Sequence, residues 1–159
     1  MKKRIPLIIV AILTFCMSTT TFGANISVKV DGKPIRWTDA KPFIDENNRT
    51  LVPVHPFANA MGLTIDWNAN SQIPRFSKGN QAIGFPIDYK YSLHYSNDYT
   101  IATTEIDTGA QVINGHSYAP AKYIAERFGY TVNWDNAEKC VTITTTKPCT
   151  TNSPIIITP

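Results

Sequence analysis

The chain has 159 residues, with 15 Lys and Arg against 12 Asp and Glu. Three of the basic residues, Lys2, Lys3 and Arg4, lie in a segment that we expect to be removed, which leaves 12 residues of each sign. A balanced charge argues against a nucleic-acid partner, since nucleic-acid binding requires a basic surface. The length predicts one domain, large enough to form a core without a structural metal.

Residues 1–23 have the pattern of a secretory signal peptide. The basic start precedes the apolar run Ile5–Phe15, and small residues end at Gly23, so we expect cleavage after Gly23 or Ala24. The run is too short to span a bilayer, and no integral membrane segment is expected after its removal. A lipoprotein signal at Cys16 is disfavoured, because a bulky Phe precedes it where a small residue is needed. The sequence thus predicts a secreted or extracytoplasmic protein.

Three short turns divide the extended segments of the chain. Asp-Gly at 31–32 follows the alternating run at 26–30, and both of its residues tolerate the positive φ of a two-residue hairpin. Asn-Asn at 47–48 and Asn-Gly at 114–115 have the same tolerance. We therefore expect a β-hairpin at each of these places.

One phrase of the sequence occurs twice, as RTLVPVHPFANAMGLTIDW at 49–67 and as HSYAPAKYIAERFGYTVNW at 116–134. The first copy predicts a strand to Val54, then a helix whose first turn accepts Pro56. Phe57 and Met61 lie on one face of that helix, and Gly62 can end it in the left-handed conformation. The second copy repeats this pattern, with its own apolar pair, glycine and tryptophan.

The predicted fold class is α+β, a mostly antiparallel sheet with two short helices near 56–61 and 121–128. Helices this short are marginal in water and need a sheet to pack on. We expect two β-hairpin–helix–β repeats, each with a strand that returns to the sheet after the helix. Trp67 and Trp134 then occupy equivalent places.

Between the two copies, residues 83–95 alternate between apolar or aromatic and polar or small residues, which indicates strands with one buried face. The segment is long for one strand, so we expect a break at 88–90 and a turn at 96–98. Two interpretations of its tyrosines stay open: a core face shared with Ile83 and Leu93, or a ligand surface. The tyrosines are Tyr89, Tyr91, Tyr95 and Tyr99.

The doubled phrase, read as RTLVPV, FANAMG and IDW and again as NGHSYAP and KYIAERFGYTVNWDN, resembles the copper amine oxidase N-terminal-like (stalk) domain of exported Gram-positive bacterial proteins. The resemblance covers residues 26–145 and implies an α+β module that carries neither copper nor a quinone cofactor and has no established activity. The family usually has arginine after the Val-Pro step, where this chain has His55 and Lys122.

Catalytic and metal-binding patterns find little support in the residues. His55, His94 and His116 form no His-x-His pair, and no Asn-Tyr-Asp/Glu stretch supplies a quinone precursor, so we expect no cofactor and no metal. Ser117 in GHSYA approaches a nucleophile elbow, but no His follows it, and we place it on a hairpin strand. Residues 66–71 resemble a calcium loop but lack its glycine, and we expect an Asn-rich turn.

Cys140 and Cys149 are the cysteines that remain after signal removal, and an even pair in an exported protein favours a disulfide. We expect the domain over 24–145 and a Thr/Pro-rich tail over 146–159. Two functions from different classes remain. One is a non-catalytic, secreted or envelope-associated stalk or interaction module with cell-wall or other envelope partners. The alternative is a secreted glycan- or peptide-binding domain that uses the tyrosine surface.

Overall fold

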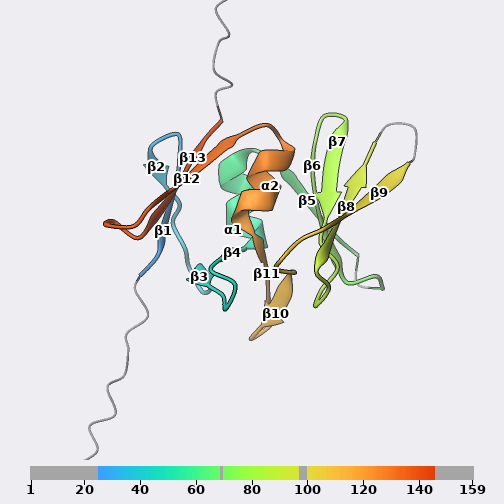
Figure 1. The fold of residues 1–159 in the computed structure, drawn as a ribbon, viewed down its shortest axis with the longest axis horizontal. Helices are drawn as coiled ribbons and strands as arrows, with labels where there is room; N and C mark the ends of the chain where they lie inside the picture. The colour runs from blue at the N-terminus through green and yellow to red at the C-terminus, as the bar shows by residue number, and fades with distance from the viewer. Residues whose placement is uncertain (1–24, 69, 97–99, 146–159) are drawn as a thin grey trace, which may run out of the picture.

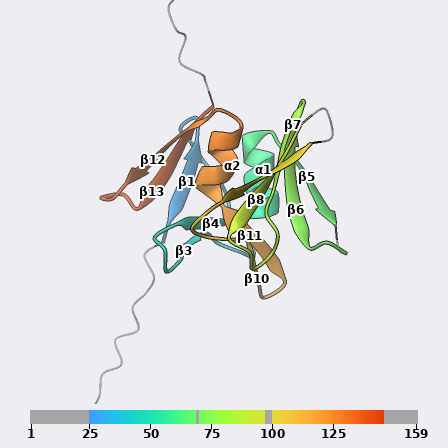
Figure 2. The ribbon, with the colours of Figure 1, turned by 45° about the vertical axis from the view of Figure 1, so that its right-hand side comes forward.

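The computed structural model describes residues 25–68, 70–96 and 100–145. In this part of the chain, three mostly antiparallel sheets surround two short helices, which confirms the predicted α+β class. Helix α1 (Val54–Met61) and helix α2 (Ala121–Arg127) lie side by side between two outer sheets, as both Figure 1 and Figure 2 show. None of the helices in the described residues is long and apolar enough to cross a membrane.

The central sheet joins the two copies of the repeated phrase. Its order is β10-β11-β4-β3, and strands β4 and β11 pair in antiparallel fashion. Val52 faces Ala119 at the middle of this pair, and the two phrase prolines, Pro53 and Pro120, lie one position to either side. The strands are β3 (Phe43–Ile44), β4 (Thr50–Pro53), β10 (Gln111–Ile113) and β11 (His116–Pro120).

One outer sheet connects the start and the end of the described chain. Its order is β12-β13-β1-β2, and β1 runs parallel to β13. The Asp31 carboxylate reinforces this pairing by accepting hydrogen bonds from the Thr145 backbone N–H (2.8 Å) and hydroxyl (2.5 Å). The strands are β1 (Ser27–Val30), β2 (Lys33–Pro34), β12 (Thr131–Asp135) and β13 (Cys140–Thr144).

The other outer sheet is an antiparallel meander of five strands in the order β5-β6-β7-β8-β9. The chain breaks between β7 and β8, as the sequence predicts for 88–90, and Asp88 in this break has a left-handed φ. The predicted turn at 96–98 includes residues outside the described part of the chain. The strands are β5 (Thr64–Asn68), β6 (Ile73–Lys78), β7 (Gln81–Gly84), β8 (Tyr91–Tyr95) and β9 (Ile101–Glu105).

The sequence-based boundaries and topology need two corrections. Helix α1 begins at Val54 rather than near Pro56, because the chain leaves the sheet directly after Pro53. The strands that follow the helices do not return to the sheet they left: β5 joins one outer sheet and β12 the other. Each helix lies between strands of two sheets, so the strand after it continues into the outer one.

Both helices end in the same pattern of backbone hydrogen bonds. Gly62 has φ 64°, and Leu63 N–H donates to the Ala58 carbonyl at 2.9 Å. In the second copy, Gly129 has φ 77°, and Tyr130 N–H donates to the Ala125 carbonyl at 3.1 Å. These are Schellman-type ends, which require a left-handed residue, and they confirm the predicted role of both glycines.

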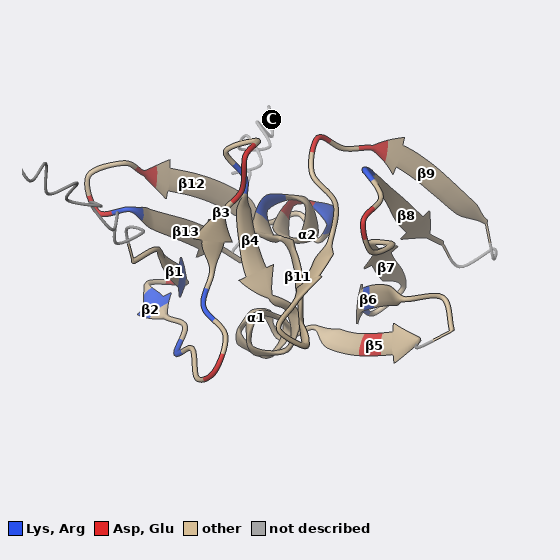
Figure 3. Ribbon diagram, turned by 90° about the horizontal axis from the view of Figure 1, so that it is seen from below, with Lys and Arg blue, Asp and Glu red and all other residues tan. Residues whose placement is uncertain are grey.

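One hydrophobic core takes side chains from both helices and from all three sheets. The predicted helix pair Phe57 and Met61 is buried there, and Ile124 of α2 is fully buried. The hairpin turns at 31–32 and 114–115 have positive φ at both residues, as predicted, and 47–48 has it at Asn48 alone. Figure 3 shows acidic and basic residues interspersed over the described elements in one view.

Candidate functional site

The predicted tyrosine surface lies on the five-stranded sheet, on the face opposite the core. Arg75 alternates with the buried Phe76 on β6, so it points away from the core, and its guanidinium carbon lies 4.7 Å from the Tyr95 ring centroid. Tyr91 and Tyr95 are four residues apart on β8, and side chains separated by an even number of residues on a strand lie on the same face. Tyr91 therefore shares the face of Tyr95. The predicted grouping of these tyrosines with Ile83 is therefore wrong, whereas Leu93 does share the face of Tyr91 and Tyr95.

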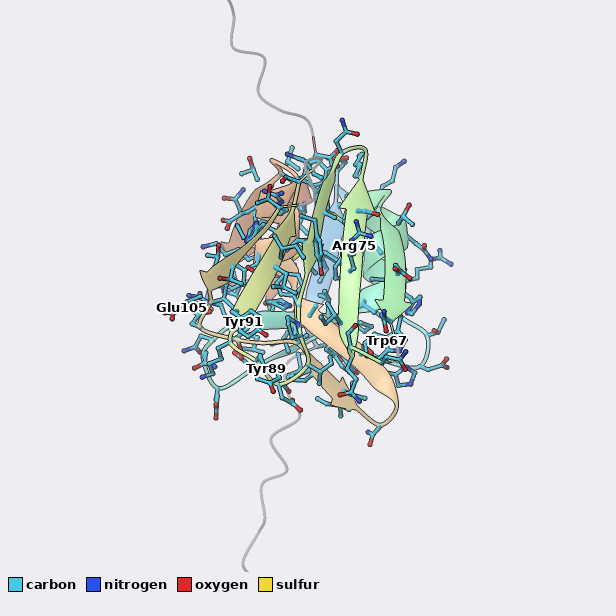
Figure 4. All side chains as sticks on the ribbon, turned by 90° about the vertical axis from the view of Figure 1, so that its right-hand side faces the viewer. Trp67, Arg75, Tyr89, Tyr91 and Glu105 are labelled. Atoms are coloured by element: carbon cyan, nitrogen blue, oxygen red, sulfur yellow. The ribbon has the colours of Figure 1, made fainter. Side chains whose placement is uncertain are left out.

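Among the predicted tyrosines that the structure describes, Tyr89 and Tyr91 lie next to each other. The rings of Tyr89 and Tyr91 lie 5.7 Å apart, and Tyr89 is 59% exposed. Figure 4 shows both at one end of the sheet, near Glu105 and away from Arg75. Tyr99 lies outside the described residues.

Tyr95 has a packing role. A Cβ atom at Gly84 would lie 3.3 Å from the Tyr95 ring, so the ring covers the place where a side chain would stand. Burial raises the pKa of its hydroxyl, although Arg75 nearby acts in the opposite direction. An aromatic ring over a strand glycine restores cross-strand packing that the glycine lacks. This tyrosine stabilises the sheet and offers little free surface.

A polar cluster ties the central sheet to helix α2. The Asp107 carboxylate accepts hydrogen bonds from Arg49 Nε and from the Tyr123 hydroxyl, both at 2.7 Å. Beside it, Asp45 accepts from the Thr108 hydroxyl and from the Arg49 backbone N–H at 2.8 Å. The hydrogen bond from Arg49 lowers the pKa of Asp107 and holds its carboxylate charged. The cluster fixes the Arg49 side chain at the edge of the sheet.

The candidate metal and catalytic residues are dispersed. His94 lies on β8, with its Nε2 2.9 Å from the Ser92 hydroxyl, and burial lowers its pKa. His55 and His116 lie elsewhere, on α1 and at the start of β11. In the described residues, no group of three or more His, Cys, Asp and Glu side chains is arranged to hold a metal. Ser117 lies on hairpin strand β11, as the sequence predicts.

The predicted calcium-like segment begins at the end of β5. Asn68 Oδ1 accepts hydrogen bonds from the backbone N–H groups of Asn70 (2.9 Å) and Ser71 (3.1 Å), which forms an Asx turn. Cys140 is buried on β13, and Cys149 lies outside the described residues, so their disulfide stays a prediction.

Two grooves flank the central hairpins, and each contains one of the repeated tryptophans. The Trp134 groove has a volume of about 380 Å³, and the Trp67 groove about 450 Å³. Trp67 and Trp134 are 39% and 42% exposed. Figure 4 shows Trp67 toward one end of the five-stranded sheet.

Seven lining positions of one groove correspond to seven of the other, sixty-seven residues along the chain. The pairs are Asn48 and Gly115, Arg49 and His116, Thr50 and Ser117, Pro53 and Pro120, Val54 and Ala121, His55 and Lys122, and Trp67 and Trp134. The prolines, helix starts and tryptophans are shared, whereas the charged positions differ. Sequence reasoning placed the two tryptophans as equivalent but missed the grooves, because their other walls come from distant segments of the chain.

Two helices held against three sheets around one core define a small α+β domain with a groove beside each helix start. The model of the copper amine oxidase N-terminal domain matches residues 29–143, and the chain belongs to this family. The match confirms the resemblance drawn from the doubled phrase, and the domain of this family is non-catalytic. No protein with a curated description and no solved structure matches the chain.

Proposed function

We propose that the chain is an exported, non-catalytic interaction module of the cell envelope. The observation that carries the proposal is the family match, which spans residues 29–143 and so nearly the whole described domain. A non-catalytic family domain thus accounts for almost all of the described residues. Export rests on the signal pattern of residues 1–23.

Amine oxidation provides the direct test of the non-catalytic assignment. The exported protein is incubated with copper and benzylamine, and peroxide release and bound copper are measured. We expect neither turnover nor stoichiometric copper, because His94 bonds to Ser92 on one sheet while His55 and His116 border the Trp67 groove. Peroxide release that a chelator abolishes would overturn the assignment.

Fractionation and a pull-down test the envelope assignment. We expect the protein in the medium or envelope fraction, with an N-terminus at Ala24 or Asn25, and retention by purified cell-wall material. Recovery of the full-length chain from the cytosol alone would contradict it.

The internal repeat is part of the same proposal, since a duplicated unit provides two similar surfaces on one domain. It is supported by the antiparallel register centred on Val52 and Ala119 and by the matching hydrogen bonds at both helix ends. In a crystal structure, segments 49–67 and 116–134 should superpose. Inequivalent positions for Trp67 and Trp134 would contradict the repeat.

A second candidate is the glycan- or peptide-binding domain with a tyrosine surface. The exposure of Tyr89 and its contact with Tyr91 favour it. Under this candidate, Tyr89→Ala should weaken retention by cell-wall material. Unchanged retention would confine these tyrosines to a structural role.

A further inference from the structure

The Trp134 groove has a one-sided charge. Its lining, all within the described part of the chain, includes Arg49, Lys122 and Lys139 but no acidic side chain. The corresponding Trp67 groove has His55 and His116 in place of two of these cations and adds Asp39. An electropositive concave surface attracts anions and concentrates them near it. The difference in charge therefore distinguishes two otherwise similar grooves.

Two of the three cations, Lys122 and Lys139, are accessible to a ligand at low cost. Lys122 lies 3.7 Å from Glu126 in an ion pair whose side chains are 50% and 48% exposed, so that solvent screens the pair. Lys139 Nζ donates to the Asn136 carbonyl at 2.7 Å, a neutral partner. Arg49 is held in place by Asp107, whose carboxylate also compensates its charge. The two adjustable lysines suit a ligand that carries more than one negative charge.

Four of the other lining side chains, one indole and three amides, are of kinds that recognise sugars. Trp134 pairs with Val141 across β12 and β13 and is left 42% exposed, so indole surface is available for the C–H face of a pyranose ring. The groove also contains the amides of Asn48, Asn133 and Asn136. Amides both donate and accept hydrogen bonds, as hydroxyl groups do. Its volume of about 380 Å³ is within the range of small-ligand sites.

We propose that the Trp134 groove binds an anionic glycan, a saccharide chain that carries carboxylate or phosphate groups. Indole surface accounts for the sugar rings, the amides for the hydroxyl groups, and the cations for the negative charges. An acidic peptide would satisfy the cations but would not use the combination of indole and amides as well. The inference rests on the proposed function in one respect: the ligand is bound and released unchanged.

Calorimetric titration of the exported protein tests the proposal with three probes of similar length. These are an oligogalacturonate, the neutral glycan cellohexaose, and an oligoglutamate peptide. We expect the oligogalacturonate to bind best, and to bind more weakly when salt shortens the Debye length to about 3 Å. Trp134→Ala should weaken binding by about tenfold, and Trp134→Phe by less, since an aromatic face remains. Lys122→Gln with Lys139→Gln should reduce both the affinity and its salt dependence.

Trp67→Ala is the matched control, because it removes the corresponding indole from the other groove. We expect it to leave oligogalacturonate affinity unchanged. The exposed Lys122→Gln variant preserves a test if Trp134→Ala fails to fold, since its side chain contributes little to packing.

Several results would overturn the proposal. If cellohexaose bound as tightly as oligogalacturonate, the cations would have no role in binding. If oligoglutamate bound more tightly than oligogalacturonate, the groove would be assigned to an acidic peptide. An equal loss of oligogalacturonate affinity in Trp67→Ala would show that binding is not specific to the Trp134 groove. Absence of binding by all three probes would overturn the inference and leave the proposed function intact, whereas chemical turnover of a probe would overturn the proposed function itself.

Discussion

Replacement of Asp107 by Asn tests whether the polar cluster stabilises the fold. The carboxylate accepts from Arg49 Nε and from the Tyr123 hydroxyl at 2.7 Å each, and Arg49 Nη2 lies 2.5 Å from it. Asparagine keeps the size and one carbonyl acceptor but removes the charge. The Arg49 guanidinium therefore loses its ion pair while the surrounding packing is preserved.

The exposure of the pair limits the magnitude. The Arg49 and Asp107 side chains are 36% and 39% exposed, and at such sites an ion pair contributes up to about 1 kcal/mol. The bond from Tyr123 contributes about 1 kcal/mol, of which the Asn carbonyl retains a part. We expect Asp107→Asn to lower the free energy of unfolding by about 1 to 1.5 kcal/mol at neutral pH.

The effect should depend on pH. The hydrogen bond from Arg49 lowers the pKa of Asp107 in the folded protein below the unfolded value of about 3.9. A carboxyl group of this kind contributes stability above its unfolded pKa and loses that stability as pH falls through its folded pKa. The difference between the wild type and Asp107→Asn should thus be complete at neutral pH and shrink in acid.

Urea unfolding followed by tryptophan fluorescence measures this difference at neutral pH and near pH ~3, on either side of the unfolded pKa. Tyr123→Phe and the double variant complete a cycle that isolates the coupling between the two residues. A wild-type stability equal to that of Asp107→Asn at neutral pH would refute the reasoning. A difference that stays constant into acid would refute the assignment of the effect to ionisation.

Three further predictions concern the backbone and the cysteines. Gly62→Ala should cost about 1 kcal/mol, because φ is 64° while an added Cβ meets nothing within 4 Å. Gly109→Ala should lower the free energy of unfolding by more, above about 2 kcal/mol, because its Cβ would lie 2.3 Å from the Tyr89 carbonyl oxygen. A urea midpoint lower for Gly62→Ala than for Gly109→Ala would contradict both predictions. In the exported protein, Cys140 and Cys149 should form a disulfide that contributes about 2 to 3 kcal/mol, and two free thiols per denatured, unreduced chain would exclude it.

Local chemistry made much of the fold predictable. The turn at 31–32 and the turn at 114–115 follow from residues that accept positive φ, and Gly62 and Gly129 end the helices for the same reason. The apolar spacing of Phe57 and Met61 specified the buried face of α1. Such preferences depend on a few neighbouring residues, so a single sequence contains them.

The sheet face of the tyrosines was not predictable in this way. The alternation over residues 83–95 predicted that Ile83 and the tyrosines lie on the same face of the sheet. The loop between β7 and β8 breaks this alternation, so the face of each side chain on β8 does not follow from its spacing to β7. Ile83 then points into the core while Tyr95 covers Gly84 on the opposite face. Periodicity specifies alternation within one strand and carries no information across a loop.

The sequence by itself determined that a strand–helix–strand phrase occurs twice, where its helices end, and which family the chain resembles. Tertiary structure alone decided that β1 pairs in parallel with β13 and that β5 and β12 enter different sheets. It also decided that Arg49 meets Asp107 and that Lys139 joins Trp134 in one groove. These contacts join residues far apart in the chain, and their geometry depends on how the sheets pack around the common core.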